Sequence, residues 1–178
     1  MSSSGAQSSP AKAHLRAALL AARRARSESD LALARAAITR RALELSKTCR
    51  CVAAYQPLRT EPGSVELLDA LGVLGVTVLL PVVRPDRDLE WVVRGSDEAR
   101  SLTDAQLVLV PALAVDRHGR RLGRGGGSYD RALARVAAGT SVLALVFDDE
   151  VLPAVPVDPW DRPVTGALTP TCQLEFSE

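Results

Sequence analysis

The 178-residue chain is poor in aromatic residues, cysteine and histidine, and each scarcity narrows what the protein can be. Six aromatic side chains leave Ala, Val and Leu to build the core. Three cysteines, Cys49, Cys51 and Cys172, cannot all pair and show no metal-ligand spacing, so we expect reduced thiols in a cytoplasmic protein. The longest apolar run, residues 71–83, contains glycine and proline and is too short to span a bilayer, so we expect no membrane partner.

The chain also lacks an excess of charge of either sign. Its formal net charge is +1, whereas nucleic-acid-binding proteins are usually strongly basic, so we expect no nucleic-acid partner. Residues 1–26 are rich in Ser and Arg and contain no acid, as organelle transit peptides do. The helical pattern from Ala11 continues without a cleavage boundary, which favours the alternative that this segment belongs to the fold. We expect a disordered tail over residues 1–10 and a single domain over residues 11–178.

Hydrophobic periodicity predicts an α/β fold. Amphipathic patterns indicate helices over residues 11–26, 27–47, 64–70 and 128–138. Continuous apolar runs indicate strands over residues 51–55, 76–83, 89–93, 107–110 and 141–147, followed by proline-rich extended segments around one short strand. Because buried parallel strands read as continuous apolar runs, we expect a mostly parallel central sheet with helices on both faces. The first helix is expected to bury Leu15, Ala18, Leu19 and Ala22, and the third Val65, Leu68 and Leu71.

The most informative segment is the glycine- and arginine-rich stretch over residues 119–131. It contains five glycines and four arginines and ends in Tyr129, Asp130 and Arg131. Glycine lets the backbone turn through positive φ and approach a ligand closely, and the arginine fork matches phosphate oxygens. A loop of this kind before a helix can direct backbone N–H groups onto an anion. It therefore predicts a phosphate cradle, with Asp130 placed to hold a metal ion.

Other phosphate and catalytic loops fit this segment less well. It contains no lysine, which excludes the Walker A loop. A dinucleotide fingerprint half fits from Gly123, with Asp148 in place of its ribose-binding acid, but Ser128 replaces the third glycine and a turn precedes the loop. A nucleophile elbow centred on Ser128 would have Asp130 in place of its last glycine. A plain flexible loop is the remaining alternative, although four arginines exceed what a linker needs.

Residues 110–131 resemble the signature of the 5-formyltetrahydrofolate cyclo-ligase family, a V-P-G-L-A-F-D-like strand end followed by G-x-R-L-G-x-G-x-G-Y-Y-D-R. The pattern is long and specific. The resemblance touches nearly the whole chain from residue 11 onward. It extends to Lys12 and Arg16 with Arg23, to residues 55–57 with Glu61, and to residues 156–161.

The resemblance implies an ATP- and Mg²⁺-dependent ligase that converts 5-formyltetrahydrofolate to 5,10-methenyltetrahydrofolate, ADP and phosphate. In that family the formyl oxygen attacks the γ-phosphate, N10 then closes the ring, and phosphate leaves. Such a reaction depends on positioning and charge neutralisation at the transferring phosphoryl group. ATP is the co-substrate, Mg²⁺ the cofactor and a monomer the expected state.

The resemblance also implies roles for individual residues. Lys12, Arg121 and Asp130 would be catalytic, and Asp130 with Asp161 would bind Mg²⁺. Tyr55, Gln56 and Glu61 would line the folate pocket. The ATP-binding set would be Lys12, Arg16, Arg121, Leu122, Gly123, Arg124, Gly125, Gly126, Gly127, Ser128 and Tyr129. For Lys12 and Arg16 the alternative is a solvated basic face, and for Glu61 a solvent-facing turn.

The chain departs from the family pattern at several places. Ser128 replaces the first of two tyrosines, Ala112 stands where glycine is usual, and Trp160 where histidine often precedes Asp161. The segment over residues 92–106 is short and lacks the G-I-x-E-P-like motif that helps to close over the folate. Two alternatives therefore stay open, a nucleotide-binding regulator without cyclo-ligase activity and an ATP-dependent enzyme acting on another small amide or pterin. Packing is favoured over ligand stacking for Trp91 and Trp160.

Overall fold

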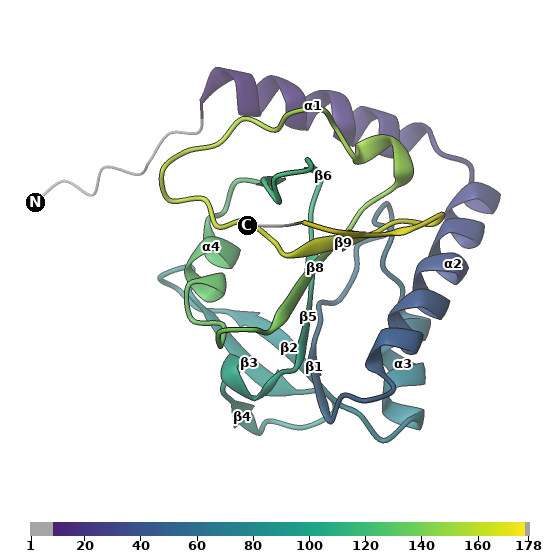
Figure 1. Cartoon of the computed structure of the whole chain (residues 1–178), viewed down its shortest axis with the longest axis vertical. Helices are drawn as coiled ribbons and strands as arrows, with labels where there is room; N and C mark the ends of the chain where they lie inside the picture. The colour runs from purple at the N-terminus through teal and green to yellow at the C-terminus, as the bar shows by residue number, and fades with distance from the viewer. Residues whose placement is uncertain (1–8, 177–178) are drawn as a thin grey trace, which may run out of the picture.

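The computed structural model describes residues 9–176 and is built around one large sheet (Figure 1). Its eight strands are, in chain order, β1 (Cys51–Ala53), β2 (Thr77–Val83), β3 (Leu89–Val93), β4 (Ala99–Arg100), β5 (Leu107–Pro111), β8 (Ser141–Leu145), β9 (Gly166–Leu168) and β10 (Gln173–Glu175). A small hairpin is formed by β6 (Ala114–Val115) and β7 (Arg121–Leu122). The helices are α1 (Pro10–Ala25), α2 (Glu28–Ser46), α3 (Val65–Val73) and α4 (Ser128–Leu133), with 3₁₀ turns η1 (Leu102–Asp104) and η2 (Asp148–Glu150).

The sheet has a parallel centre and antiparallel edges. Its strand order is β10-β9-β8-β5-β1-β2-β3-β4, and the pairs from β9 through β2 are parallel. Strand β10 at one edge and β3 and β4 at the other pair antiparallel. The predicted α/β class with a mostly parallel sheet is confirmed.

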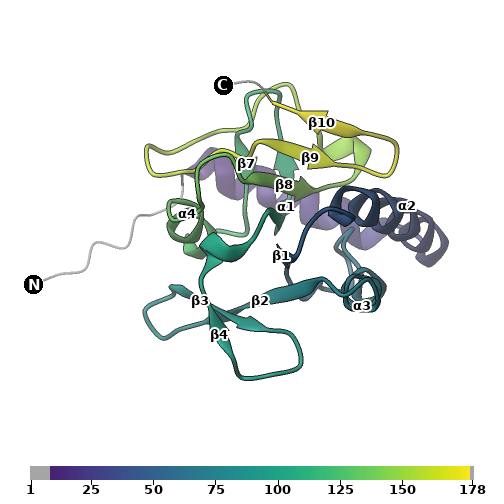
Figure 2. The same ribbon diagram turned by 60° about the horizontal axis from the view of Figure 1, so that its bottom comes forward.

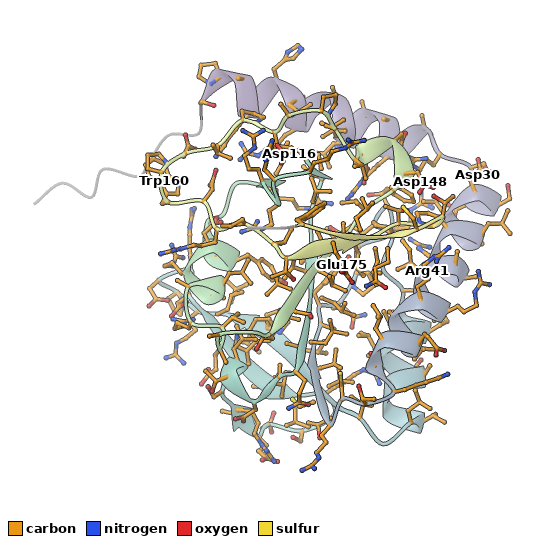
Figure 3. The ribbon with its side chains drawn as sticks, viewed as in Figure 1. Asp30, Arg41, Asp116, Asp148, Trp160 and Glu175 are labelled. Atoms are coloured by element: carbon orange, nitrogen blue, oxygen red, sulfur yellow. The ribbon has the colours of Figure 1, made fainter. Side chains whose placement is uncertain are left out.

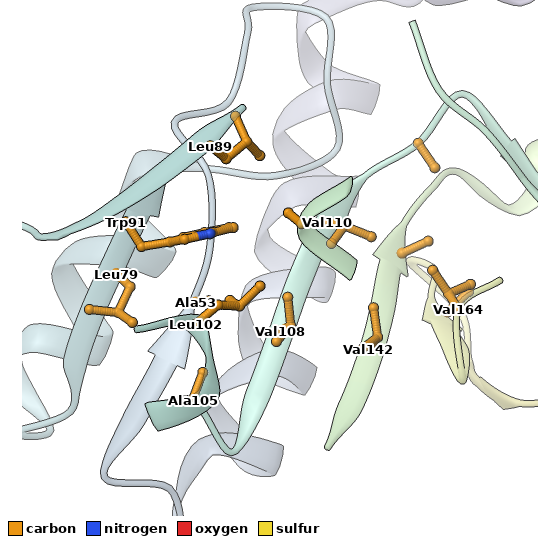
Figure 4. Close-up of a cluster of buried hydrophobic side chains, with 14 of the residues drawn as sticks. Ala53, Leu79, Leu89, Trp91, Leu102, Ala105, Val108, Val110, Val142 and Val164 are labelled. Atoms are coloured by element: carbon orange, nitrogen blue, oxygen red, sulfur yellow. The ribbon is translucent and has the colours of Figure 1, made fainter. Parts of the chain in front are cut away.

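Side chains of the central strands alternate between two buried clusters, one on each face of the sheet. In β5, Val108 and Val110 join one cluster, and Leu107 and Leu109 join the other. The first cluster holds Trp91 and the inward side of α4 (Figure 4). The second is covered by α2 and α3, which lie on the opposite face from α4 (Figure 2). Burial on both faces explains why the strands read as continuous apolar runs.

The strand order reverses at β1. The connection from β1 through α3 leads to β2 on one side, whereas β5 pairs on the other side and continues through α4 to β8. The two crossovers place their helices on opposite faces, as right-handed connections running in opposite directions must. In open α/β sheets, ligands bind at the carboxyl ends of the strands where the order reverses. The segments leaving β1 and β5 therefore border the expected ligand crevice.

Three helices begin at serine N-caps. The Ser27 and Ser64 side chains accept backbone N–H bonds that cap α2 and α3, and Ser9 does the same for α1 with Pro10 as its first residue. Residues 1–8 of the predicted tail lie outside the described residues, and Ser9 and Pro10 belong to the start of α1. Of the helices in residues 9–176, none is long and apolar enough to cross a membrane.

Two predicted helix faces are wrong in part. In α1, Ala18 and Ala22 are exposed, while the inward side carries Leu15, Leu19 and two fully buried cations. In α3, Val65 is 39% exposed, and the neighbouring Leu67 takes the expected inward position. In both helices the side that packs is set by the tertiary partners it meets, which apolar periodicity does not encode.

The predicted bounds of helices and strands differ most from the observed ones in the C-terminal half of the chain. Helix α4 ends at Leu133, not at residue 138, because the chain tightens into i→i−3 turns where Arg135 reaches across to Asp88. The region after η2 contains two short strands where one was predicted. Strand β4 and the β6–β7 hairpin were not predicted, because two-residue strands carry no periodic signal.

Candidate active site

Helix α1 runs across the carboxyl ends of the parallel strands (Figure 1). Lys12, Arg16 and Arg23 are spaced four and seven residues apart, so they share the side of the helix that faces these strand ends. Lys12 and Arg23 are 3% and 1% exposed. The alternative of a solvated basic face is therefore wrong for Lys12, whose charge is buried against partners.

The Lys12 ammonium is held by two carboxylates of the segment that precedes β9. Its Nζ donates to Asp158 at 2.5 Å and to Asp161. Asp161 also accepts the backbone N–H of Asp158 at 2.8 Å, so the two acids form one tight turn. Asp161, predicted as a second metal contact, thus lies directly beside the predicted phosphate-binding lysine.

A second buried ion pair joins the glycine-rich segment to helix α4. The Arg121 guanidinium donates to Asp130 Oδ1 at 2.5 Å, and the same oxygen accepts the backbone N–H of Arg162 at 3.1 Å. Burial lowers the pKa of Arg121, and the charges of Asp130 and Asp161 oppose that effect. Its Nε is buried and has no hydrogen-bond partner among the described residues, which leaves one donor unused.

The loop over residues 123–127 has the backbone geometry of a close-approach site. Gly125 and Gly127 have φ of 101° and 69°, values that favour glycine. Arg16 Nε donates to the carbonyl oxygen of Gly123 at 2.8 Å, and a Cβ atom at Gly125 would lie 3.5 Å from Arg16 Cζ. The loop therefore folds over the α1 arginine, which brings two elements of the predicted ATP site together.

Glu61 approaches the glycine loop from the segment that follows β1, the strand at which the strand order reverses. It ends the turn after β1, where its Oε2 accepts the backbone N–H of Leu58 at 2.9 Å. Its Oε1 accepts a hydrogen bond from Arg124 Nε at 3.1 Å. Glu61 is 3% exposed, so the alternative of a solvent-facing turn residue is wrong. The glycine loop and the predicted folate-side acid are in contact.

The remaining predicted pocket residues have different surroundings. Tyr129 lies by Glu61 and Arg121, and burial, then the Glu61 charge, raise the pKa of its hydroxyl. Tyr55 packs in the cluster under α2 and α3, where burial raises the pKa of its hydroxyl well above the usual range. Its hydroxyl has no hydrogen-bond partner among residues 9–176, and the residue lines a cavity of about 10 Å³, the size of one water. Gln56 is exposed.

Several polar residues that support the site were given no role in the sequence analysis. The Arg23 guanidinium donates to both oxygens of Glu150 at 2.6 and 2.8 Å and to the carbonyl of Ala112 at 2.6 Å. These bonds fasten α1 to the segments that leave β5 and β8. The fully buried Asp116 lies below α1 (Figure 3) and accepts the backbone N–H groups of His118, Arg120 and Val155. The sequence does hold a signal for Asp158, because it precedes Asp161 by three residues within the stretch 156–161 that takes part in the family resemblance.

The shortened segment after Trp91 forms a compact β3–β4 hairpin followed by η1. Trp91 is 3% exposed and packs in the core (Figure 4), whereas Trp160 is 52% exposed at the outer end of its loop (Figure 3). A cavity of about 410 Å³ borders this hairpin, lined by Trp91, Arg100 and Arg135 among others. None of the predicted site residues lines it. Residues 99–102 of this segment form part of its lining.

The donor set is compatible with Mg²⁺. Asp130 and Asp161 offer hard carboxylate oxygens, and both approach Arg121 closely enough to affect its pKa. Magnesium usually keeps several waters and takes one or two protein carboxylates together with substrate phosphates. Within the described part of the chain, no group of three or more His, Cys, Asp or Glu residues could hold a metal ion by itself. A site shared with phosphate oxygens fits these residues.

The comparisons with known proteins agree with the resemblance. A model of the 5-formyltetrahydrofolate cyclo-ligase family matches residues 8–170. The chain belongs to this family. A cyclo-ligase from Mycolicibacterium smegmatis is 45% identical over 143 residues, which cover 68% of this chain and 74% of the relative.

Solved structures of 5,10-methenyltetrahydrofolate synthetases share the fold of this cyclo-ligase family member. The Mycoplasma pneumoniae protein aligns with a TM-score of 0.81 at 19% identity, covering 89% of this chain and 98% of the other. The Aquifex aeolicus protein aligns with a TM-score of 0.76 at 23% identity, covering 94% and 93%. At these identities the likeness shows the fold alone, and the roles of individual residues stay predictions.

Proposed function

We propose that this protein is an active 5-formyltetrahydrofolate cyclo-ligase that uses MgATP. The observation that carries the proposal is the contact of Arg124, from the glycine loop, with the buried Glu61 at the strand-order reversal. A regulator that bound only nucleotide would need the loop and the α1 cations but no buried acid opposite them. The contact between the two halves favours an enzyme that brings a phosphate and a second substrate together.

The nucleotide end of the site is rich in cations. Lys12, Arg16, Arg121 and Arg124 converge from α1 and the glycine loop, and they would neutralise the triphosphate and align its γ-phosphate. Asp130 and Asp161 would hold Mg²⁺, which supplies charge neutralisation at the phosphate oxygens. Lys12 is already paired with Asp161, and Arg121 with Asp130. When MgATP enters, each cation can pass to a phosphate oxygen and each carboxylate to the Mg²⁺ ion.

The folate end of the site depends on Glu61. Its carboxylate can accept the two neighbouring N–H donors of a pterin ring, as a carboxylate does with any amidine-like edge. Tyr129 is close enough to both Glu61 and Arg121 for their charges to act on its hydroxyl, and its ring would separate the pterin from the phosphates. In that arrangement the formyl oxygen attacks the γ-phosphorus as the bond to ADP breaks. N10 then attacks the activated carbon and loses its proton to solvent, and phosphate leaves as the ring closes.

The proposal includes a monomer in the cytoplasm with ATP and 5-formyltetrahydrofolate as its partners, without nucleic acid or membrane. Cys49, Cys51 and Cys172 are free thiols in the structure, in agreement with a reducing compartment. Burial raises the pKa of Cys49 and Cys51, which keeps both protonated and unreactive. The balanced net charge supports small-molecule substrates over a polyanion.

The deciding experiment mixes the protein with 5-formyltetrahydrofolate and MgATP and follows methenyltetrahydrofolate by its absorbance. We expect product to appear only when both substrates and Mg²⁺ are present. Clear ATP binding by calorimetry without product at high enzyme concentration would instead support a nucleotide-binding regulator. Product from another amide, but not from this folate, would support a different substrate.

Two variants test the assignment of residues within that assay. Lys12→Ala should raise KM for ATP by about tenfold or more, because a charge-assisted hydrogen bond contributes about 1.5–3 kcal/mol, and should change KM for the folate less. Asp130→Asn should abolish most Mg²⁺-dependent turnover while circular dichroism shows an intact fold. Arg117→Ala, in the exposed turn between β6 and β7, is the matched control and should behave as the wild type. The reverse order of KM changes would remove Lys12 from the phosphate site.

A further inference from the structure

Two of the buried carboxylates that pair with arginine, Glu150 and Glu61, are held in different ways. Glu150 and Arg23 form a two-pronged pair, with bonds of 2.6 and 2.8 Å and side chains 2% and 1% exposed. Glu61 receives a single bond of 3.1 Å from Arg124, whose side chain is 42% exposed. A bidentate, fully buried pair is a permanent part of the structure, whereas a single, longer bond from an exposed arginine is easily exchanged.

Arg124 is also placed to move. It stands between Gly123 and Gly125, which carry no side chains, and its own side chain is 42% exposed, so the guanidinium can change partner while Arg16 holds the backbone at the Gly123 carbonyl. Glu61, in contrast, is fixed by the Leu58 N–H bond to its other oxygen and is 3% exposed. The carboxylate therefore stays in place while the guanidinium can leave it. A triphosphate in the neighbouring loop is a stronger attraction for a guanidinium than one carboxylate.

We infer that Arg124 couples the two substrate sites, because ATP draws its guanidinium from Glu61 and so opens the carboxylate to the folate. The inference rests on the proposed function and adds an order of events to it. Without nucleotide, Arg124 occupies the oxygen that the pterin N–H groups need. With nucleotide bound, Glu61 is a buried charge without its cation, and such a group is costly unless new donors reach it. The pterin supplies these donors, so ATP raises the affinity for the folate.

Thermodynamic linkage makes this coupling reciprocal. If ATP tightens folate binding by a given factor, the folate tightens ATP binding by the same factor. Coupling between two sites is typically about 5- to 150-fold. The enzyme would thereby favour the ternary complex over either binary one, and ATP would not be committed without a folate in place.

The test measures the Kd of 5-formyltetrahydrofolate by calorimetry, with and without the magnesium complex of a non-hydrolysable ATP analogue. For the wild type we expect the analogue at saturation to lower this Kd at least about fivefold. For Arg124→Gln, which keeps length but loses charge, we expect tighter folate binding than wild type without the analogue and a coupling factor near one. Arg124→Ala should give the same pattern, and Arg117→Ala should keep the wild-type coupling factor.

The outcomes separate this inference from the proposed function. Turnover and folate binding together with unchanged coupling in both Arg124 variants would overturn the role of Arg124 and leave the cyclo-ligase activity standing. A wild type whose folate Kd does not respond to the analogue would do the same. Absence of both folate binding and turnover would overturn the inference and the proposed function together. A purely structural role for Arg124 predicts weaker folate binding without nucleotide in the variants, the opposite of the expected change.

Discussion

At the scale of single residues, several buried ion pairs gather at the carboxyl ends of the parallel strands. Arg23 is the most completely buried of these cations, at 1% exposed, and its guanidinium lies 5.5 Å from the centre of the Phe147 ring. Burial raises the pKa of its partner Glu150, and the hydrogen bonds and charge of Arg23 oppose that rise. The pair binds α1 to the strands, so it positions Lys12 and Arg16 without touching a ligand itself.

We therefore predict that Arg23→Met destabilises the protein by about 3–5 kcal/mol, because it leaves the Glu150 carboxylate buried without a cation. Urea unfolding of both proteins measures the difference. The double variant Arg23→Met with Glu150→Leu should recover much of the loss, since replacement of both partners removes the unpaired charge. Equal losses in the single and double variants would show that the packing volume, and not the charge, is what matters.

At the scale of elements, the β6–β7 hairpin carries Arg121 and leads into the glycine loop, so its placement positions the site. Its turn is clamped to the segment before β9 by the bond from Val164 N to Gly119 O at 2.8 Å. Gly119 has a φ of 72°, and a Cβ atom there would lie 2.3 Å from the carbonyl oxygen of Val164. The hairpin can therefore approach the segment that carries Asp158 and Asp161 only because residue 119 is glycine.

Gly119→Ala should destabilise the protein by at least about 2 kcal/mol, from backbone strain together with the backbone clash. Gly95→Ala is the matched control, because Gly95 has a φ of 83° and a Cβ atom there would meet nothing within 4 Å. That variant should cost only about 1 kcal/mol for the strained backbone. Thermal or urea unfolding measures both, and equal effects would mean that the close approach at Gly119 is relieved by a small shift.

Asp116 holds the same hairpin, and its contribution should depend on pH. Burial alone would raise its pKa, but bonds from Val155, His118 and Arg120 outweigh it and leave the pKa lowered. A lowered pKa means that the stabilisation is complete above the unfolded value of about 3.9 and is lost as pH falls through the folded value. The stability difference between the wild type and Asp116→Asn should be largest at neutral pH and shrink below about pH 4. Urea unfolding from pH 3 to 7 measures it.

At the scale of the whole molecule, the site is assembled from segments that are far apart in the chain. Lys12 is 149 residues from Asp161, and Arg124 is 63 residues from Glu61. A ligand that bridges these segments cross-links the N-terminal helix, the β1 exit and the C-terminal loop. Binding should therefore stabilise the fold as a unit and not only the loop that touches the ligand.

MgATP analogue at about 100 times its Kd should add about 2.7 kcal/mol to the free energy of unfolding. For a chain of this size that corresponds to a rise in Tm of roughly 5–11 °C. Differential scanning calorimetry measures the shift, and Asp130→Asn in the presence of Mg²⁺ should show a smaller one. A wild-type Tm that does not respond to the analogue would contradict the nucleotide site.

Much of this architecture follows from local sequence. The helix starts at Ser27 and Ser64 follow from capping chemistry, which acts within three residues. The central strands follow from their continuous apolar runs, and the phosphate-binding character of residues 119–131 follows from glycine and arginine chemistry. The family assignment comes from the same residues, and the match over residues 8–170 confirms it.

Other features were decided only when distant segments came together. Apolar periodicity in α1 predicted inward Ala18 and Ala22, but the side that packs is the one whose Lys12 and Arg23 find acidic partners on segments more than a hundred residues away. Helix α4 stops short where its backbone tightens into i→i−3 bonds, and Arg135 beyond its end bonds to Asp88 in the turn between β2 and β3. The contact between Arg124 and Glu61 has no local signal, since the reversal of strand order at β1 creates it. Composition and spacing determined the elements and the chemistry of the loop, whereas partners for buried charges depend on the three-dimensional arrangement and could be decided only by the tertiary structure.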